Sequence, residues 1–206
     1  MNSVHLLKTI QNLKKMEPQC IVAYGTSLTA QEFWVDELRA LLAKRYPELA
    51  TVINSAEGAM WSEWGVDNLE NRVLVHRPDM VFIEFAMNDA YLPYNTGLEQ
   101  CKYRLEVMIE RIWETNRSCD IILMTMNPPI GEHLTIRPRI EEYYDVYRTV
   151  AKERNLPLID HYAAWKLILE HDEERFQRLV PDGIHPAPIG DKAVTIVGVE
   201  KLLFHS

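Results

Sequence analysis

The sequence lacks the features that mark several large classes of protein. No apolar run approaches the roughly 18 residues that a membrane-spanning helix needs, and residues 1–20 have the pattern of an amphipathic helix without the apolar stretch or cleavage site of a signal peptide. Only three residues are cysteine, they are widely spaced, and no Cys-x-x-Cys pair occurs. This usage indicates reduced thiols, with neither a disulfide framework nor a zinc site. We therefore expect a cytoplasmic protein without a metal.

Positive charge and glycine are also scarce. The chain has 22 Lys and Arg residues against 30 Asp and Glu, a formal net charge of −8, and its longest basic cluster is Lys14-Lys15. An acidic surface repels phosphate backbones and anionic lipids, so neither a nucleic acid nor a membrane is an expected partner. The eight glycines form no G-x-G-x-x-G pattern and no Walker lysine motif occurs, which argues against a nucleotide-binding loop.

What the sequence does contain is an alternation of short apolar runs and longer helical patterns. With 206 residues, 47% of them apolar, the chain has the size of one globular domain, residues 1–206. The expected strands are residues 20–24, 51–54, 80–85, 120–125 and 156–159, and the expected helices are residues 30–46, 62–76, 98–116, 137–154, 162–170 and 187–204. This order predicts an α/β fold: a three-layer α/β/α sandwich around a mainly parallel five-stranded sheet.

Polar residues follow the predicted strands, at the edge where open parallel sheets bind ligands. Ser27 follows the first strand, and Asp182 and His185 share a turn-rich segment before the last helix. A carboxylate so close to a histidine can hold the imidazole in one tautomer, leaving the other nitrogen to take a proton from a serine hydroxyl. Each residue taken alone also fits a plainer role, Ser27 as a helix cap and His185 as a solvated loop residue beside a turn-forming aspartate.

Asn88 follows the third strand and suggests a second element of the same chemistry. Its side-chain amide, with the backbone amides of Ser27 and Gly58, would supply three donors to an oxyanion. The alternative is an ordinary Asn-Asp turn. Three such donors at one sheet edge would stabilise the negative charge that forms during acyl transfer, so the sequence predicts an oxyanion hole at these residues.

Four sequence blocks, in this order, resemble those of the SGNH hydrolases, also called GDSL-type esterases. They are YGTSLT with Ser27, NSAEGA with Gly58, AMND with Asn88, and DGIHP with Asp182 and His185. The resemblance spans nearly the whole chain and implies a flavodoxin-like fold and no cofactor. It also implies hydrolysis through an acyl-serine, with Ser27 as nucleophile, His185 as proton shuttle and Asp182 orienting His185.

Two positions depart from the pattern of that family. Thr26 stands where the first block commonly has aspartate, so the hydrogen bonds within this loop must differ. Ala86 stands where the third block commonly has glycine, and its methyl group would narrow the space beside the oxyanion hole and disfavour bulky acyl groups. Glu84 is a further oddity, a carboxylate inside an apolar strand, for which we expect a cationic or hydrogen-bonding partner.

Four aromatic residues, Trp61, Trp64, Tyr91 and Tyr94, follow the two oxyanion-hole blocks closely. They would either line a substrate pocket, as a sugar-stacking platform or an acyl wall, or pack the starts of their helices. The sequence thus favours a serine esterase that removes small acyl groups, acetyl first, from a small-molecule ester such as an acetylated carbohydrate. The alternatives are a long-chain thioesterase or lysophospholipase of the same family, or a non-catalytic flavodoxin-like module that binds a phosphate or nucleotide.

Overall fold

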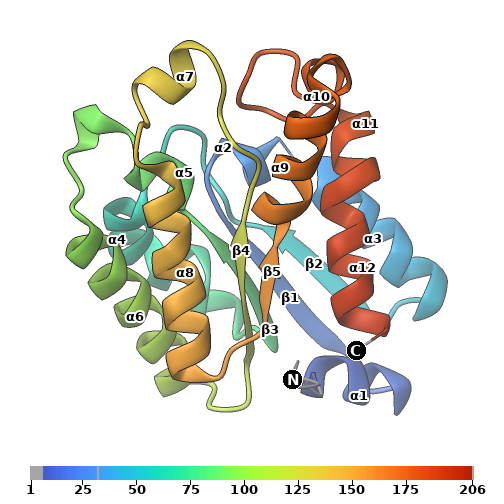
Figure 1. The fold of residues 1–206 in the computed structure, drawn as a ribbon. Helices are drawn as coiled ribbons and strands as arrows, with labels where there is room; N and C mark the ends of the chain where they lie inside the picture. The colour runs from blue at the N-terminus through green and yellow to red at the C-terminus, as the bar shows by residue number, and fades with distance from the viewer. Residues whose placement is uncertain (1–6, 32, 206) are drawn as a thin grey trace.

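The centre of the molecule is a five-stranded, entirely parallel sheet (Figure 1). The computed structural model describes residues 7–31 and 33–205. The strands are β1 (Gln19–Gly25), β2 (Ala50–Asn54), β3 (Met80–Glu84), β4 (Asp120–Thr125) and β5 (Leu158–Asp160), in the spatial order β2-β1-β3-β4-β5. All five predicted strands are present, and the prediction of a parallel sheet is confirmed.

Helices cover both faces of this sheet. On the left in Figure 1 lie α4 (Ser62–Arg72), α6 (Leu98–Thr115) and α8 (Ile140–Arg154), packed side by side. On the right lie α3 (Phe33–Arg45) and α12 (Ile196–Phe204), which pack against each other. The remaining α-helices of the described residues are α1 (Lys8–Lys14), α2 (Ser27–Ala30), α5 (Ala86–Asp89), α7 (Glu132–Thr135), α9 (His161–His171), α10 (Glu173–Leu179) and α11 (Pro188–Gly190), and 3₁₀-helices lie at Leu74–His76 and Leu92–Tyr94. The predicted three-layer α/β/α architecture is confirmed.

Prolines account for two of the differences from the predicted boundaries. The helix expected from residue 137 begins at Ile140, because Pro138 disfavours helical geometry in the residue before it. The strand expected from residue 156 begins at Leu158, because Pro157 has no N–H to donate to a neighbouring strand. The last predicted helix is divided into α11, a π-helical turn (Asp191–Thr195) and α12. Helix α10 was not predicted.

The three central strands, β1, β3 and β4, are apolar because nearly all of their residues are buried. Every residue of β3 is buried, and Trp34 of α3 meets Phe82 edge to face with the ring centroids 5.6 Å apart.

A smaller second cluster packs beneath α9 and α10, and consists of Trp165, Phe176, Leu179, Val180 and Val194. This cluster matters for function because the segment that follows Val180 carries Asp182 and His185. That segment is also tied at its far end, where the Ala187 amide donates to the Leu179 carbonyl at 2.8 Å.

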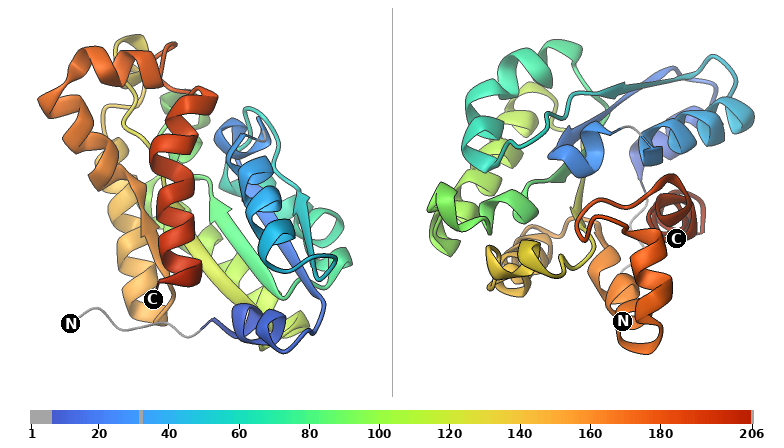
Figure 2. Two further views of the ribbon diagram at one scale, coloured as in Figure 1. Left: turned by 90° about the vertical axis from the view of Figure 1, so that its right-hand side faces the viewer. Right: turned by 90° about the horizontal axis from the view of Figure 1, so that it is seen from above.

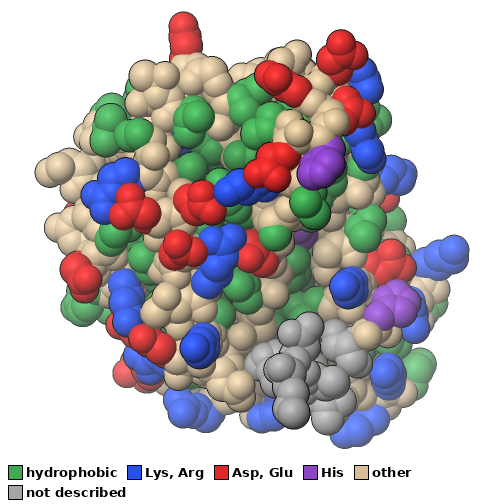
Figure 3. Space-filling model, viewed as in Figure 1, with side chains coloured by type: hydrophobic (Ala, Val, Ile, Leu, Met, Phe, Trp, Pro, Cys, Tyr) green, Lys and Arg blue, Asp and Glu red, His purple; other side chains and the backbone are tan. Residues whose placement is uncertain are grey.

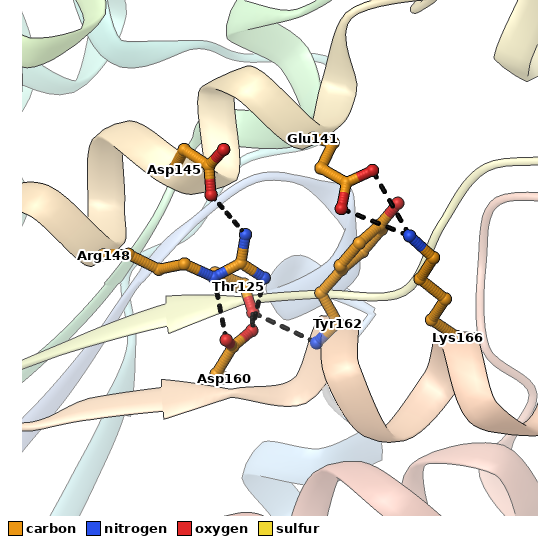
Figure 4. Close-up of polar contacts among 7 residues, drawn as sticks. All are labelled: Thr125, Glu141, Asp145, Arg148, Asp160, Tyr162 and Lys166. Carbon is orange, nitrogen blue, oxygen red and sulfur yellow. Dashed lines mark hydrogen bonds and ion pairs between the residues drawn. The ribbon is translucent and has the colours of Figure 1, made fainter.

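Charged hydrogen bonds fasten α8 and α9 to the ends of β4 and β5 (Figure 4). The Arg148 guanidinium donates to both Asp160 oxygens, at 2.8 and 3.0 Å, and to Asp145 at 2.7 Å. Thr125 donates to Asp160 at 2.7 Å and accepts from the Tyr162 amide at 3.1 Å. Burial favours a higher pKa for Asp160, but the Arg148 and Thr125 hydrogen bonds hold that pKa below its usual range. These charge-assisted hydrogen bonds fix the β5 edge of the sheet.

The three cysteines, Cys20, Cys101 and Cys119, are free thiols, as predicted. Burial raises the pKa of both Cys101 and Cys119, so these thiols stay protonated and unreactive. Among residues 7–31 and 33–205, no group of three or more His, Cys, Asp or Glu side chains is placed to hold a metal ion.

The face of the molecule shown in Figure 3 has acidic and basic side chains interleaved, with apolar side chains between them. In the part of the chain that the structure describes, no helix combines the length and the apolar character that crossing a bilayer demands.

Candidate active site

The order of the strands places the site. The chain runs from β1 outward to β2, then crosses back to β3 on the other side of β1, so the order reverses between β1 and β3. Open parallel sheets bind ligands at such a reversal, beyond the carboxyl ends of the strands. Helix α2, which begins at Ser27 after β1, and helix α5, which contains Asn88 after β3, lie at the upper end of the sheet in Figure 1, the end that faces the viewer in the right-hand view of Figure 2.

Glu84 holds the loop that carries Ser27. Gly25 and Glu84 are register partners in β1 and β3, and a β-carbon at Gly25 would overlap the Glu84 carboxylate and carbonyl. That carboxylate accepts from the Thr26 amide and the Thr29 hydroxyl, both at 2.7 Å, and from the Thr26 hydroxyl at 3.1 Å. The expected partner of Glu84 is therefore a set of hydroxyl and amide donors. These contacts also give a reason for threonine at position 26, where the resembled family commonly has aspartate. The Thr26 hydroxyl donates to the Glu84 carboxylate within this loop.

Thr26, and not Ser27, caps the helix that follows. The Thr26 hydroxyl accepts from the Leu28 amide at 3.2 Å, which is the hydrogen bond of an N-cap residue. The Ser27 hydroxyl is thereby left for another partner, and its Oγ lies 2.9 Å from His185 Nε2. Helix α2 has only four residues, so a charge at Ser27 would be stabilised by individual amides and not by a long helix dipole.

Asp182 holds His185 in the orientation that a general base requires. Its Oδ2 lies 2.7 Å from His185 Nδ1, while its Oδ1 accepts from the backbone amides of His185 at 2.7 Å and Ile184 at 3.0 Å. Burial favours a higher pKa for Asp182, but these hydrogen bonds together hold that pKa below its usual range. The charged carboxylate fixes the proton on Nδ1 and leaves the Nε2 lone pair facing Ser27. The structure thus joins the three predicted residues in one series of hydrogen bonds.

Residues after β4 support this segment from the side. The buried Asn127 side chain donates to the Ile184 carbonyl at 2.9 Å, and the Ile130 amide donates to the Gly183 carbonyl at 2.8 Å. Gly183 has φ +84°, a conformation that favours glycine, and a β-carbon there would lie only 3.2 Å from the Ile130 side chain. Asn127 was not among the predicted site residues. Its one sequence signal is its position, a polar residue two positions after the end of an apolar strand and before two prolines.

Gly58 lies between two fixed points of the predicted oxyanion hole. The Glu57 amide donates to the Gly25 carbonyl at 3.1 Å, next to the loop that carries Ser27. On the other side, the Asn88 side chain donates to the Met60 carbonyl at 2.9 Å. A β-carbon on Gly58 would meet no atom within 4 Å, so this side of the loop is open. Asn88 keeps a second amide hydrogen for a ligand, as the prediction requires.

Three of the four predicted pocket aromatics lie together beside this loop. Trp61 stacks on Tyr94 with ring centroids 4.3 Å apart, and Tyr91 meets Tyr94 edge to face at 5.0 Å. The Tyr94 hydroxyl donates to the Ala59 carbonyl at 2.5 Å, and Ala59 itself has φ +60°. The stacked pair therefore secures a turn of positive φ next to Gly58, and the stacking covers one face of the Trp61 ring.

Trp64 lies elsewhere. Its ring packs against the core, 5.7 Å from the ring of Tyr24 and 6.5 Å from that of Phe85. Arg72 covers it at 5.4 Å. Trp61 and Trp64 are three residues apart, but Trp61 precedes α4 and only Trp64 lies within it.

Glu84 makes the stability of the protein depend on pH. Burial raises the pKa of Glu84 from 4.5 to about 7, although the Thr29 and Thr26 hydrogen bonds lower it. Between these values the folded protein keeps a proton that the unfolded chain has released. The contribution of Glu84 to stability is therefore fully present below about pH 4.5 and is lost, by roughly 3 kcal/mol, as the pH rises through 7.

The Glu84→Gln variant tests this dependence, since glutamine mimics the protonated acid. We expect it to match the wild-type free energy of unfolding near pH 4.5 and to exceed it by a few kcal/mol near pH 8, in urea denaturation. The pKa of Asp191 is also raised to about 7 by burial, so only the difference between the two proteins isolates Glu84. An equal difference at both pH values would contradict the prediction.

Comparison with known proteins agrees with this geometry. Residues 21–193 match the GDSL-like lipase/acylhydrolase family. An arylesterase of Vibrio mimicus is 22% identical over 181 residues, 88% of this chain and 84% of that protein. A lipase/acylhydrolase from Enterococcus faecalis superposes with a TM-score of 0.74 at 27% identity, over 89% of this chain and 95% of the other. A catalytic mutant of an acetylxylan esterase from Geobacillus stearothermophilus gives a TM-score of 0.78 at 21% identity, over 91% and 95%. The chain belongs to the GDSL-like lipase/acylhydrolase family and is a carboxylic ester hydrolase.

Proposed function

We propose that this protein is a serine esterase that removes small acyl groups, acetyl first, from the hydroxyl groups of carbohydrates. The observation that carries the proposal is the hydrogen-bonded series from Ser27 Oγ through His185 to Asp182, with steps of 2.9 and 2.7 Å. A serine hydroxyl needs such a base to be nucleophilic near neutral pH. As an ester hydrolase, the protein is not the non-catalytic binding module considered above.

The reaction proceeds in two halves through an acyl-serine. Ser27 Oγ attacks the ester carbonyl as His185 Nε2 takes its proton, and His185 then gives that proton to the departing alcohol. Water attacks the acyl-serine in the second half, with His185 again taking and returning one proton. Asp182 stays ionised and stabilises the imidazolium. The amides of Ser27 and Gly58 and the side chain of Asn88 stabilise the oxyanion, each donor contributing about 3 kcal/mol.

Two local features favour a small acyl group on a carbohydrate. Ala86 is buried at the start of α5, where its methyl group occupies space that the commoner glycine would leave open. The pair of Trp61 and Tyr94 presents aromatic surface beside the Gly58 loop, and aromatic faces bind sugar rings. One similar structure is that of an acetylxylan esterase, which is consistent with this choice.

A series of p-nitrophenyl esters, from acetyl to decanoyl, tests the proposal. We expect kcat/KM to peak at acetyl and to fall about tenfold or more per few added methylenes, because the extra carbons must find room beside Ala86. Acetylated xylooligosaccharides, assayed by acetate release, should then be better substrates than acetyl esters of simple aliphatic alcohols.

The paired controls are Ser27→Ala, which should remove the activity, and Ser118→Ala, whose serine lies just before β4 at the opposite end of the sheet and should leave it unchanged. A maximum at long chains would retain the triad and identify a long-chain thioesterase or lysophospholipase instead. Activity that survives in Ser27→Ala would show that Ser27 is not the nucleophile.

A further inference from the structure

A buried arginine lies directly behind the predicted oxyanion hole. Arg137, in the segment between α7 and α8, is only 7% exposed. Its Nε donates to the Met87 carbonyl at 2.9 Å, and its Nη2 donates to Asn88 Oδ1 at 3.3 Å. The guanidinium also covers the ring of Tyr91, 4.8 Å from the centroid. Arg137 was not predicted as a site residue, and it reaches Asn88 from a segment 49 residues further along the chain.

These contacts decide how the Asn88 amide is turned. The Met60 carbonyl can only accept a hydrogen bond, and the guanidinium can only donate one. Asn88 satisfies both when Nδ2 faces Met60 and Oδ1 faces Arg137, which is the arrangement observed. The opposite orientation would set Oδ1 against a carbonyl and the NH₂ group against a cation. One Nδ2 hydrogen is thereby kept free for a ligand.

Packing alone does not explain a cation at this position. Burial lowers the pKa of Arg137, which reports the cost of keeping the charge away from water. Its Nη1 has no hydrogen-bond partner among the described residues, and the acceptors of Nε and Nη2 are neutral oxygens. An apolar side chain of similar size would fill the same space at lower cost. What an apolar side chain cannot do is donate to Asn88.

We propose that Arg137 is a positioning residue for ester hydrolysis, which holds the Asn88 amide so that its free N–H faces the oxyanion. The inference rests on the proposed role of Asn88. A cation bonded to Oδ1 also draws electron density from the amide, which makes Nδ2–H a stronger donor when the negative charge develops. The effect of Arg137 is therefore exerted in the transition state, through Asn88, and not on binding of the ester.

A double-mutant cycle on p-nitrophenyl acetate tests this inference. Asn88→Ala should lower kcat about 10²- to 10³-fold, and Arg137→Met about 10- to 100-fold with KM little changed. The double variant should be no slower than Asn88→Ala alone, because Arg137 then has no amide to position. Multiplied effects in the double variant, or a folded Arg137→Met enzyme with wild-type kcat, would overturn the inference.

Two further variants separate positioning from folding. Arg137→Lys keeps the charge but lacks the planar fork that serves Met87 and Asn88 together, so it should lose kcat while remaining folded in thermal unfolding. Arg139→Met is the matched control, since Arg139 is exposed and pairs with Glu142, and its kcat should be unchanged. Wild-type kcat in folded Arg137→Lys would also count against the inference. If Asn88→Ala itself kept full kcat, the proposed oxyanion hole would fail, and the proposed role of Arg137 with it. If Asn88→Ala lost kcat while the Arg137 variants kept it, only the proposed role of Arg137 would fail.

Discussion

Replacing His185 by alanine is expected to lower kcat for p-nitrophenyl acetate about 10⁵- to 10⁶-fold. His185 Nε2 is the hydrogen-bond partner of Ser27 Oγ at 2.9 Å, and without it the hydroxyl proton has no acceptor at the moment of attack. The His185 side chain is partly exposed, so the variant should fold with little change in its free energy of unfolding. The measurement is kcat in steady-state hydrolysis, with urea denaturation as the check on folding.

The same proposal predicts that the triad residues do not act independently. Ser27→Ala should cost about as much as His185→Ala, and the double variant should be no slower than either, since both remove the same step. The activity that remains above the uncatalysed rate would come from the oxyanion hole and from binding. Two losses that multiply, or an activity in His185→Ala within tenfold of wild type, would show that Ser27 and His185 do not form one catalytic unit.

The fold and the three hydrogen-bonded residues of the candidate site, Ser27, Asp182 and His185, could be predicted from the sequence because their signals are local. Each strand is a short apolar run, and each functional block follows one, so Ser27 and Asn88 are placed as soon as the sheet is taken to be parallel. Asp182 and His185 are three residues apart in one turn, a spacing that already allows the contact that the structure contains. Topology then brings Ser27 and His185 together across 158 residues of chain.

The residues that support the candidate site could not be predicted, because they make contacts between segments that have no sequence pattern of their own. Arg137 reaches Asn88 from a loop 49 residues further along the chain, and Asn127 reaches Ile184 across 57 residues. Both are single polar residues beside proline, a context that mostly indicates a turn. Glu84 differs, because a carboxylate in an apolar strand indicates that a hydrogen-bonding or cationic partner is present. Identifying that partner requires knowledge of the register between β1 and β3.

Asparagine at position 182 is expected to lower kcat about 10⁴-fold while leaving the fold intact. The reason lies in the two backbone amides, of His185 and Ile184, that donate to Asp182 Oδ1. In the Asp182→Asn variant the side-chain oxygen must stay with these donors, so the new NH₂ group faces His185 Nδ1. That nitrogen must then accept, which moves the imidazole proton to Nε2. An Nε2–H group cannot take the proton of Ser27.

The Asp182→Ala variant separates the tautomer from the turn. It removes the oxygen that holds the two amides as well as the partner of Nδ1, so it should lose stability by about 1–3 kcal/mol, whereas Asp182→Asn should lose much less. In Asp182→Ala the imidazole is free to adopt either tautomer, and kcat should therefore fall no further than in Asp182→Asn despite the greater structural loss. The measurements are kcat on p-nitrophenyl acetate and the free energy of unfolding of both variants. An Asp182→Asn enzyme within tenfold of wild type would mean that His185 Nε2 does not act as the base toward Ser27.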